Sequence, residues 1–164
     1  MQWSCVSSFF AVVLITQSAA AYAQQAVILV RHADKVDQSK DPPLSKAGEA
    51  RAQRLASLLK DAGIAAIYTS EFQRTNKTAE PLALALKIQP VTVPAADREG
   101  LLQRLRAEHR DDVVLIVGHD SSVPALLKAL GHPADITIAG NEYDNLFILL
   151  PKATGPPAMV RLRY

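Results

Sequence analysis

The 164-residue sequence contains few of the residue types that build disulfide-linked or metal-binding domains. Cys5 is its only cysteine, and its four histidines show no His-x-x-x-His or His-x-His spacing. An internal disulfide framework is therefore excluded, and we expect no metal site. Net charge is also small, and a formal value of +2 gives no reason to expect nucleic acid as a partner.

Charged side chains are missing from the first 30 residues, which contain no Lys, Arg, Asp or Glu. The apolar run at residues 9–15 is shorter than the roughly 20 apolar residues that a transmembrane helix needs. Small residues follow it, and Ala-Tyr-Ala at residues 21–23 fits a signal-peptidase site. We therefore expect a signal peptide over residues 1–23 and a periplasmic or secreted protein. The alternatives are an uncleaved anchor and a buried first helix, because no basic side chain precedes the run.

Residues 24–164 have the size and hydrophobic content of one domain, and they contain no internal repeat or linker. Short β-branched runs alternate with segments in which apolar residues recur at helical spacing. Strands are predicted at residues 27–30, 64–69, 91–93, 113–117, 146–150 and 159–162. Helices are predicted at residues 46–60, 75–86, 98–110 and 123–130. This order predicts an α/β domain, a three-layer sandwich with a mainly parallel central sheet.

Three polar segments follow strands of this predicted sheet. Arg31 and His32 come directly after the first strand, Arg74 lies in the segment after the second, and His119 follows the fourth. Ligands of open parallel sheets bind outside the carboxyl ends of the strands. We therefore expect two arginines and two histidines from distant parts of the chain to meet at one edge.

Such a group of side chains suits phosphoryl transfer. A guanidinium binds two phosphoryl oxygens at once, and a neutral imidazole is a competent nucleophile. Neighbouring arginines lower the pKa of an imidazole and keep it neutral. A cationic pocket also stabilises the negative charge that spreads over a transferring phosphoryl group.

The same segments resemble the signatures of a known family. Residues 31–33 (Arg-His-Ala) look like the Arg-His-Gly/Ala signature of the histidine phosphatase superfamily, also called phosphoglycerate mutase-like. Residues 70–79 (SEFQRTNKTA) are similar to its Ser-x-x-x-Arg-x-x-x-Thr-Ala segment, and residues 117–119 (Val-Gly-His) resemble its second-histidine motif. The resemblance covers essentially all of residues 24–164. It implies a phosphoglycerate mutase-like fold and no cofactor.

The resemblance also implies roles for the matching residues. His32 would be the nucleophile that becomes phosphohistidine, and water would then hydrolyse this intermediate. Arg31, Arg74 and His119 would bind the phosphoryl group.

The proton donor for the leaving alkoxide is left open. Larger members of the family carry an acid after the third strand, where Asp97 and Glu99 lie. The acid phosphatase branch carries it directly after the second histidine, the position of Asp120. Asp97 and Asp120 are the leading candidates, although each could instead cap a helix. Asp34 is a further option, which could instead pair with Lys35.

Other polar residues are given a structural interpretation. His109 lies at a charged helix end and is predicted to be solvated, and His132 is predicted to lie in a turn. Tyr143 either lines the pocket or belongs to the edge of a strand.

Together these features predict an exported phosphatase that acts on phosphomonoesters through His32. Its substrate would be a phosphorylated small molecule or an envelope glycolipid, and the mature chain would contain no integral membrane span. The short chain leaves little length for a cap, so we expect an open pocket. The alternatives are a phosphatase of phosphohistidine on a protein, and a protein that binds a phosphorylated ligand without turnover.

Overall fold

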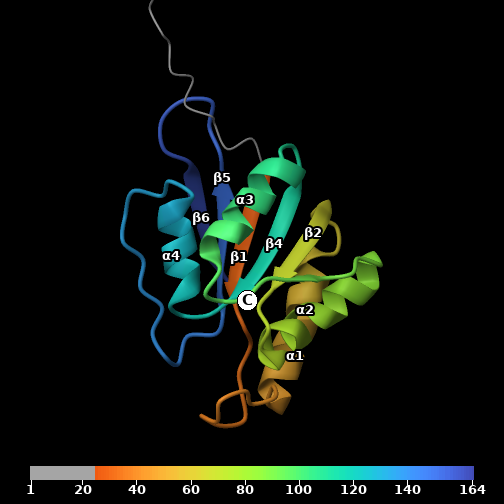
Figure 1. Ribbon diagram of the computed structural model, residues 1–164. Coiled ribbons are helices and arrows are strands. Elements are labelled where there is room, and N and C mark those ends of the chain that lie inside the picture. Colours follow the sequence, from red (N-terminus) through yellow and green to blue (C-terminus); the bar gives the residue numbers. More distant parts are fainter. Residues whose placement is uncertain (1–24) are drawn as a thin grey trace, which may run out of the picture.

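The computed structural model describes residues 25–164, and the predicted signal peptide at residues 1–23 lies outside the described residues. A six-stranded sheet with the order β3-β2-β4-β1-β5-β6 forms its centre (Figure 1). The strands are β1 (Ala26–Arg31), β2 (Ile64–Thr69), β3 (Val91–Thr92), β4 (Val113–Gly118), β5 (Asn145–Leu150) and β6 (Ala158–Arg163). Strands β1 to β4 pair in parallel, and β5 and β6 are antiparallel to their neighbours. The prediction of a mainly parallel sheet is confirmed.

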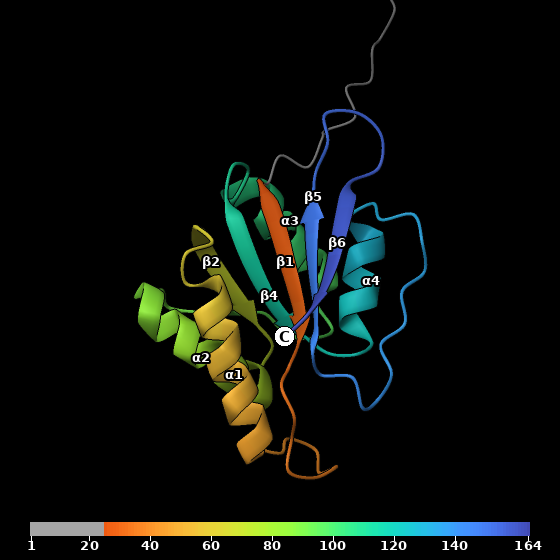
Figure 2. The ribbon, with the colours of Figure 1, turned by 180° about the vertical axis from the view of Figure 1, so that it is seen from behind.

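Helices cover both faces of the sheet, as a three-layer sandwich requires. They are α1 (Lys46–Leu59), α2 (Gln73–Leu86), α3 (Arg98–Glu108) and α4 (Ser122–Ala129). Helices α1 and α2 lie on one face, and α3 and α4 lie on the other (Figures 1 and 2). Alternate side chains of β1 therefore enter two separate cores, and every residue of the strand is buried.

Helix α2 differs from its predicted bounds. It begins at Gln73 rather than at residue 75, so Arg74 lies in its first turn. Pro81 lies inside this helix, which continues through it as one element although proline cannot donate a helical hydrogen bond.

The turn after β1 is held by both helices of its face. The backbone N–H of Ala33 donates to Oγ1 of Thr78 at 2.8 Å, and that hydroxyl donates to the carbonyl of Arg74 at 2.7 Å. On α1, a Cβ at Gly48 would lie 2.1 Å from the carbonyl oxygen of Asp34, so this close approach needs glycine. The end of β1 is therefore fixed relative to α1 and α2.

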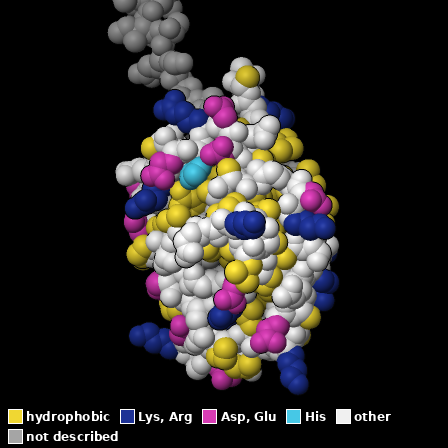
Figure 3. All heavy atoms as spheres, turned by 90° about the vertical axis from the view of Figure 1, so that its right-hand side faces the viewer, with side chains coloured by type: hydrophobic (Ala, Val, Ile, Leu, Met, Phe, Trp, Pro, Cys, Tyr) yellow, Lys and Arg dark blue, Asp and Glu magenta, His cyan; other side chains and the backbone are white. Residues whose placement is uncertain are grey.

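Two further features are the distribution of charge on the surface and the length of the helices. Figure 3 shows basic and acidic side chains interspersed on one face of the molecule. No helix within residues 25–164 is long and apolar enough to cross a membrane.

Candidate active site

The carboxyl ends of β1, β2 and β4 bring together the two arginines and two histidines that the sequence singled out. The ring centroids of His32 and His119 lie 5.4 Å apart, with an angle of 64° between the ring planes. Arg31 and Arg74 are near enough to act electrostatically on both rings. Four residues from three distant segments thus surround one small volume.

His32 is held as a neutral ring with a defined proton position. Its side chain is buried, and Nδ1 lies 2.9 Å from the carbonyl oxygen of Ala33. Because a carbonyl can only accept, Nδ1 carries the proton and Nε2 of the neutral ring has the free lone pair. Burial, with the positive charges of Arg31 and Arg74 adding to it, lowers the pKa of His32 to about 4. The ring is therefore an unprotonated nucleophile at neutral pH.

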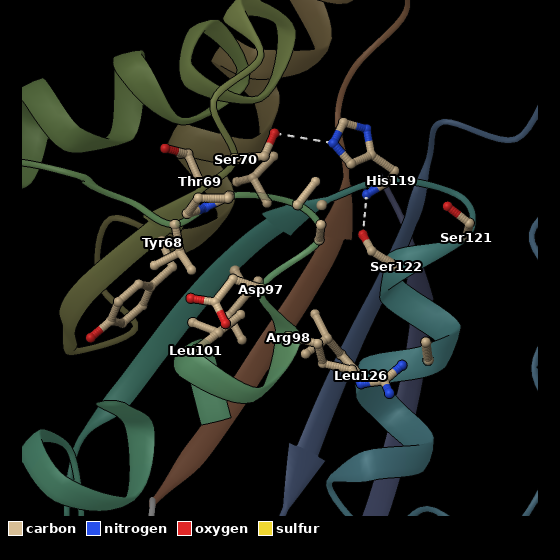
Figure 4. A pocket seen from close by; sticks show the side chains of 18 of the residues that line it. Tyr68, Thr69, Ser70, Asp97, Arg98, Leu101, His119, Ser121, Ser122 and Leu126 are labelled. Carbon is tan, nitrogen blue, oxygen red and sulfur yellow. Dashed lines mark hydrogen bonds between the residues drawn. The ribbon is translucent and has the colours of Figure 1, made fainter. Parts of the chain in front are cut away.

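His119 is fixed by two serines, as Figure 4 shows. Its Nε2 lies 3.0 Å from Oγ of Ser70, and its backbone N–H donates to Oγ of Ser122 at 2.8 Å. The ring of Phe72 packs edge-on against the imidazole, with the centroids 5.3 Å apart. Burial lowers the pKa of His119, and Arg74 lowers it further. Ser70 belongs to the motif at residues 70–79, but only its contact with His119 shows its role.

Arg31 has only 3% of its surface exposed and joins the end of β1 to the loop before β5. Its Nη1 donates to three carbonyl oxygens of that loop, those of Ala139, Gly140 and Glu142. Its Nη2 lies 3.0 Å from Oδ2 of Asp120. The guanidinium stacks over the ring of Tyr143 at 4.1 Å, and that ring lies 5.8 Å from the ring of His32. Tyr143 therefore lies beside the predicted site residues.

Arg74 projects from the first turn of α2 and is held by a loop far upstream. Its guanidinium carbon lies 4.2 Å from the centre of the Phe72 ring, and its Nη1 lies 3.4 Å from Oδ1 of Asp41. The carboxylate of Asp41 also accepts from the backbone N–H of Gln73 at 3.0 Å, which caps the helix. Phe72, at the N-cap position itself, makes no side-chain capping bond.

Each of the two guanidinium groups has one buried N–H donor that is not satisfied. Within residues 25–164, Nε of Arg31 and Nε of Arg74 have no hydrogen-bond partner. An unsatisfied buried donor costs about 1–3 kcal/mol. An anion that accepted from these groups would remove that cost.

Two of the candidate proton donors lie near the start of α3, after β3. Oδ1 of Asp97 accepts from the backbone N–H of Gly100 at 2.9 Å and caps α3, as its alternative interpretation predicted. Glu99 is exposed and lies 3.6 Å from Arg106. Each carboxylate thus already has a structural partner.

The other two candidates are engaged in ion pairs. Asp120 pairs with Arg31, and 43% of its side chain is exposed. Asp34 pairs with Arg51 at 2.6 Å. The sequence predicted Lys35 as its partner, and the ion pair forms with Arg51 instead. Burial alone would raise the pKa of Asp34, but the hydrogen bond from Arg51 and the positive charges of Arg51 and Arg54 together lower it.

Glu71 is a neighbour of the site that sequence reasoning did not identify. Its Oε2 accepts from the backbone N–H of Ala95 at 2.8 Å, which joins the loop after β2 to the loop before α3. This hydrogen bond lowers the pKa of Glu71, and His119 and Arg74 lower it further. Its place directly after Ser70, inside the motif, was the one available signal.

The prediction for His109 is wrong. Only 16% of its side chain is exposed, and its Nδ1 lies 2.8 Å from Oδ2 of Asp112. Its Nε2 lies 2.9 Å from the hydroxyl of Tyr68, which comes from β2. The imidazole therefore joins α3 to the sheet.

Within residues 25–164, no group of three or more His, Cys, Asp or Glu could hold a metal.

Comparisons with known proteins agree with this arrangement. The family model of the histidine phosphatase superfamily (branch 1) matches residues 27–99. "Probable phosphoglycerate mutase GpmB" of Proteus mirabilis is 36% identical over 75 residues, which are 42% of this chain and 35% of that protein. The chain thus matches about a third of the length of this curated relative.

Solved structures match over most of their length. A mycobacterial glucosyl-3-phosphoglycerate phosphatase with inorganic phosphate aligns with a TM-score of 0.67 at 15% identity, over 85% of this chain and 96% of that chain. A protein assigned as the phosphohistidine phosphatase SixA of Agrobacterium tumefaciens aligns with a TM-score of 0.59 at 25% identity, over 77% of this chain and 92% of that chain. In its fold and its matched signatures, the chain is thus similar to the histidine phosphatase superfamily, whose family model covers residues 27–99.

Proposed function

We propose that the protein is a phosphatase that hydrolyses phosphomonoesters through a phosphohistidine on His32. The observation that carries this proposal is the buried, neutral imidazole of His32, whose Nε2 lone pair is free beside Arg31, Arg74 and His119. A neutral nucleophile among cationic and hydrogen-bonding groups is what attack on a phosphoryl group requires. The match of residues 27–99 to the model of the histidine phosphatase superfamily supports the same chemistry.

The reaction has two displacement steps. Nε2 of His32 attacks phosphorus, the N–P bond forms, and the P–O ester bond breaks with its electron pair leaving on the alcohol oxygen. The leaving oxygen takes up a proton, and water then attacks the phosphohistidine and releases inorganic phosphate. Arg31, Arg74 and His119 bind the phosphoryl oxygens in both steps.

Asp97 and Asp120 remain the proposed sources of the proton. Asp120 is directly after His119 and partly exposed, but its carboxylate is engaged by Arg31. Asp97 would have to release Gly100 at the start of α3 before it could act. Comparing Asp97→Asn with Asp120→Asn decides between them, because loss of the acid slows poor leaving groups more than good ones.

The location and the substrate source are also proposals. The anatomy of residues 1–23 supports export to the periplasm or the exterior. An exported phosphatase would meet phosphorylated small molecules or envelope glycolipids. A fusion of residues 1–30 to a reporter active only after export would test this point, and retention in the cytoplasm would refute it.

A second candidate function is hydrolysis of phosphohistidine on a protein. The likeness to the protein assigned as SixA supports it, as does the engagement of the candidate acids in other bonds. Export would argue against it. Rates on para-nitrophenyl phosphate and on a phosphohistidine peptide separate the two candidates.

The central test is hydrolysis of para-nitrophenyl phosphate by the purified protein and by His32→Ala. We expect the variant to lose at least about a thousandfold in rate, because no other side chain supplies the nucleophile. Circular dichroism would check that the variant is folded. Rapid quenching should trap an acid-labile phosphoenzyme in the wild type only. Phosphate binding without His32-dependent turnover would instead identify a binding protein.

A further inference from the structure

A cavity of about 440 Å³ adjoins His119 on the face of the sheet that carries α3 and α4 (Figure 4). Its size lies within the range of about 300–1,000 Å³ found for small-molecule sites. Its inner wall consists of side chains that also belong to the hydrophobic core of this face: Tyr68, Val93, Leu101, Ile116 and Leu126. His119 and Ser70 lie at one end of the cavity, so it opens next to the phosphoryl site.

Several polar groups that line the cavity already make hydrogen bonds. Ser70 and Ser122 both bond to His119, and the hydroxyl of Tyr68 bonds to His109. The carboxylate of Asp97 caps α3. The exposed residues Arg98, Glu99 and Ser121 also line the cavity, but its inner wall is apolar. An apolar wall favours an apolar part of a ligand over a polyol.

The acids around the site point to the same kind of occupant. An alkoxide is a poor leaving group that needs a proton during bond cleavage, whereas a phenolate departs with much less help. Asp97 caps a helix, Asp120 and Asp34 are in ion pairs, and Glu71 holds the backbone of Ala95. Leaving groups that are both aromatic and weakly basic fit this site.

We propose, on the basis of the phosphatase function proposed above, that this cavity binds the leaving group of the substrate and selects aryl phosphomonoesters. The aromatic ring occupies the cavity while the phosphoryl group lies between His32 and His119. Nε2 of His32 bonds to phosphorus as the P–O(aryl) bond breaks. The electron pair leaves on the aryl oxygen as a phenolate, which takes a proton from solvent. Water then hydrolyses the N–P bond.

The test compares kcat/KM for 1-naphthyl phosphate and for glycerol 3-phosphate in the wild type and in variants that fill the cavity. Ala125 is half-buried on α4 and lines the cavity, and Ala96 is exposed and also lines it. Ala125→Phe fills the interior, and Ala96→Phe obstructs the cavity at an exposed position that folding tolerates. Ala107→Phe is the matched control, because Ala107 is exposed on α3 and does not line the cavity.

We expect the wild type to prefer 1-naphthyl phosphate. We also expect Ala125→Phe and Ala96→Phe to lower kcat/KM for this substrate by roughly tenfold or more, the equivalent of losing one buried aromatic group. The inhibition constant of inorganic phosphate should stay unchanged, because the phosphoryl site is intact. The control should behave as the wild type.

Wild-type kinetics on 1-naphthyl phosphate in both cavity variants would overturn the proposal, even if the wild type prefers aryl esters. Failure to hydrolyse any ester would refute the phosphatase function instead. The affinity for 1-naphthyl phosphate, measured by titration calorimetry, would then test whether the cavity binds the aromatic ring. Weaker binding to Ala96→Phe than to Ala107→Phe would support the proposal, and equal binding would overturn it.

Discussion

The two sides of the candidate site are built in opposite ways. On the side of α1 and α2, Thr78 joins Ala33 to the carbonyl of Arg74, and Asp41 caps α2 beside the Arg74 guanidinium. On the side of α3 and α4, the neighbour of His119 is an apolar cavity. We infer that the two sides of the site bind different parts of the substrate. The hydrogen-bonded side fixes the invariant part of a substrate, the phosphoryl group, and the hollow side accommodates the part that varies.

Replacing Arg74 by alanine is the strongest test of this division. We expect kcat/KM to fall by about 10²–10³-fold, because a group that stabilises transition-state charge is lost. The fall should be the same for 1-naphthyl phosphate and glycerol 3-phosphate, since the phosphoryl group is common to both. A loss that depends on the leaving group would contradict the assignment of Arg74 to the phosphoryl side.

The pH dependence of activity tests the environment of His32. With its pKa lowered from 6.5 to about 4, His32 stays unprotonated down to that pH. We expect the contribution of His32 to kcat/KM to fall about tenfold per pH unit only below about pH 4. The profile for 1-naphthyl phosphate is first corrected for the ionisation of the phosphomonoester itself, which has a pKa of about 6. An acid limb near pH 6.5 that persists after this correction would show that the ring titrates as if exposed.

The same shift has a consequence for stability. Between pH 6.5 and about 4 the unfolded chain binds a proton at His32 that the folded chain does not bind. The free energy of unfolding should therefore decrease as pH falls through this window, and the contribution should level off below it. His32→Ala provides the control for urea titrations, because it should lack this part of the decrease.

Thr78→Val tests whether the hydrogen-bonded side depends on one hydroxyl. Thr78 and Ala33 are both fully buried, so the variant leaves the N–H of Ala33 unsatisfied. We expect a loss of about 1–3 kcal/mol in the free energy of unfolding, together with reduced turnover. The exposed Thr92, changed to valine, is the matched control and should alter neither quantity.

Asp41→Asn should have the smallest effect. The amide oxygen can still cap α2, but the charge beside Arg74 is lost, and the ion pair is partly exposed. We expect a change of only a few-fold in KM and a nearly unchanged Tm. A loss as large as that of Arg74→Ala would mean that the loop holding Asp41 is itself part of the phosphoryl site.

Much of this architecture is predictable from the sequence, because short-range patterns decide it. The β-branched runs around Ile28 and Leu115 have no alternation, which is typical of strands buried on both faces. The position of His32 and His119 directly after such runs places both at the same edge.

The remaining features depend on partners that are distant in sequence. The start of α2 at Gln73 relies on a cap from Asp41, 32 residues upstream, and no local pattern reveals it. His109 is only partly exposed because its imidazole bonds to Tyr68 and Asp112, whereas its charged neighbours in the sequence predicted a solvated side chain. Likewise, the engagement of Asp34 by Arg51 rather than Lys35 follows from the packing of α1.

The cavity shares its inner wall with the hydrophobic core, and this has a consequence for how the protein can change. A ligand that fills the cavity packs against these core residues, so its binding should raise the melting temperature. Conversely, a substitution at Leu101 or Ile116 that reshapes the cavity also perturbs the core. Changes in substrate preference are therefore coupled to thermostability, and new specificities at this site should first arise in variants with stability to spare.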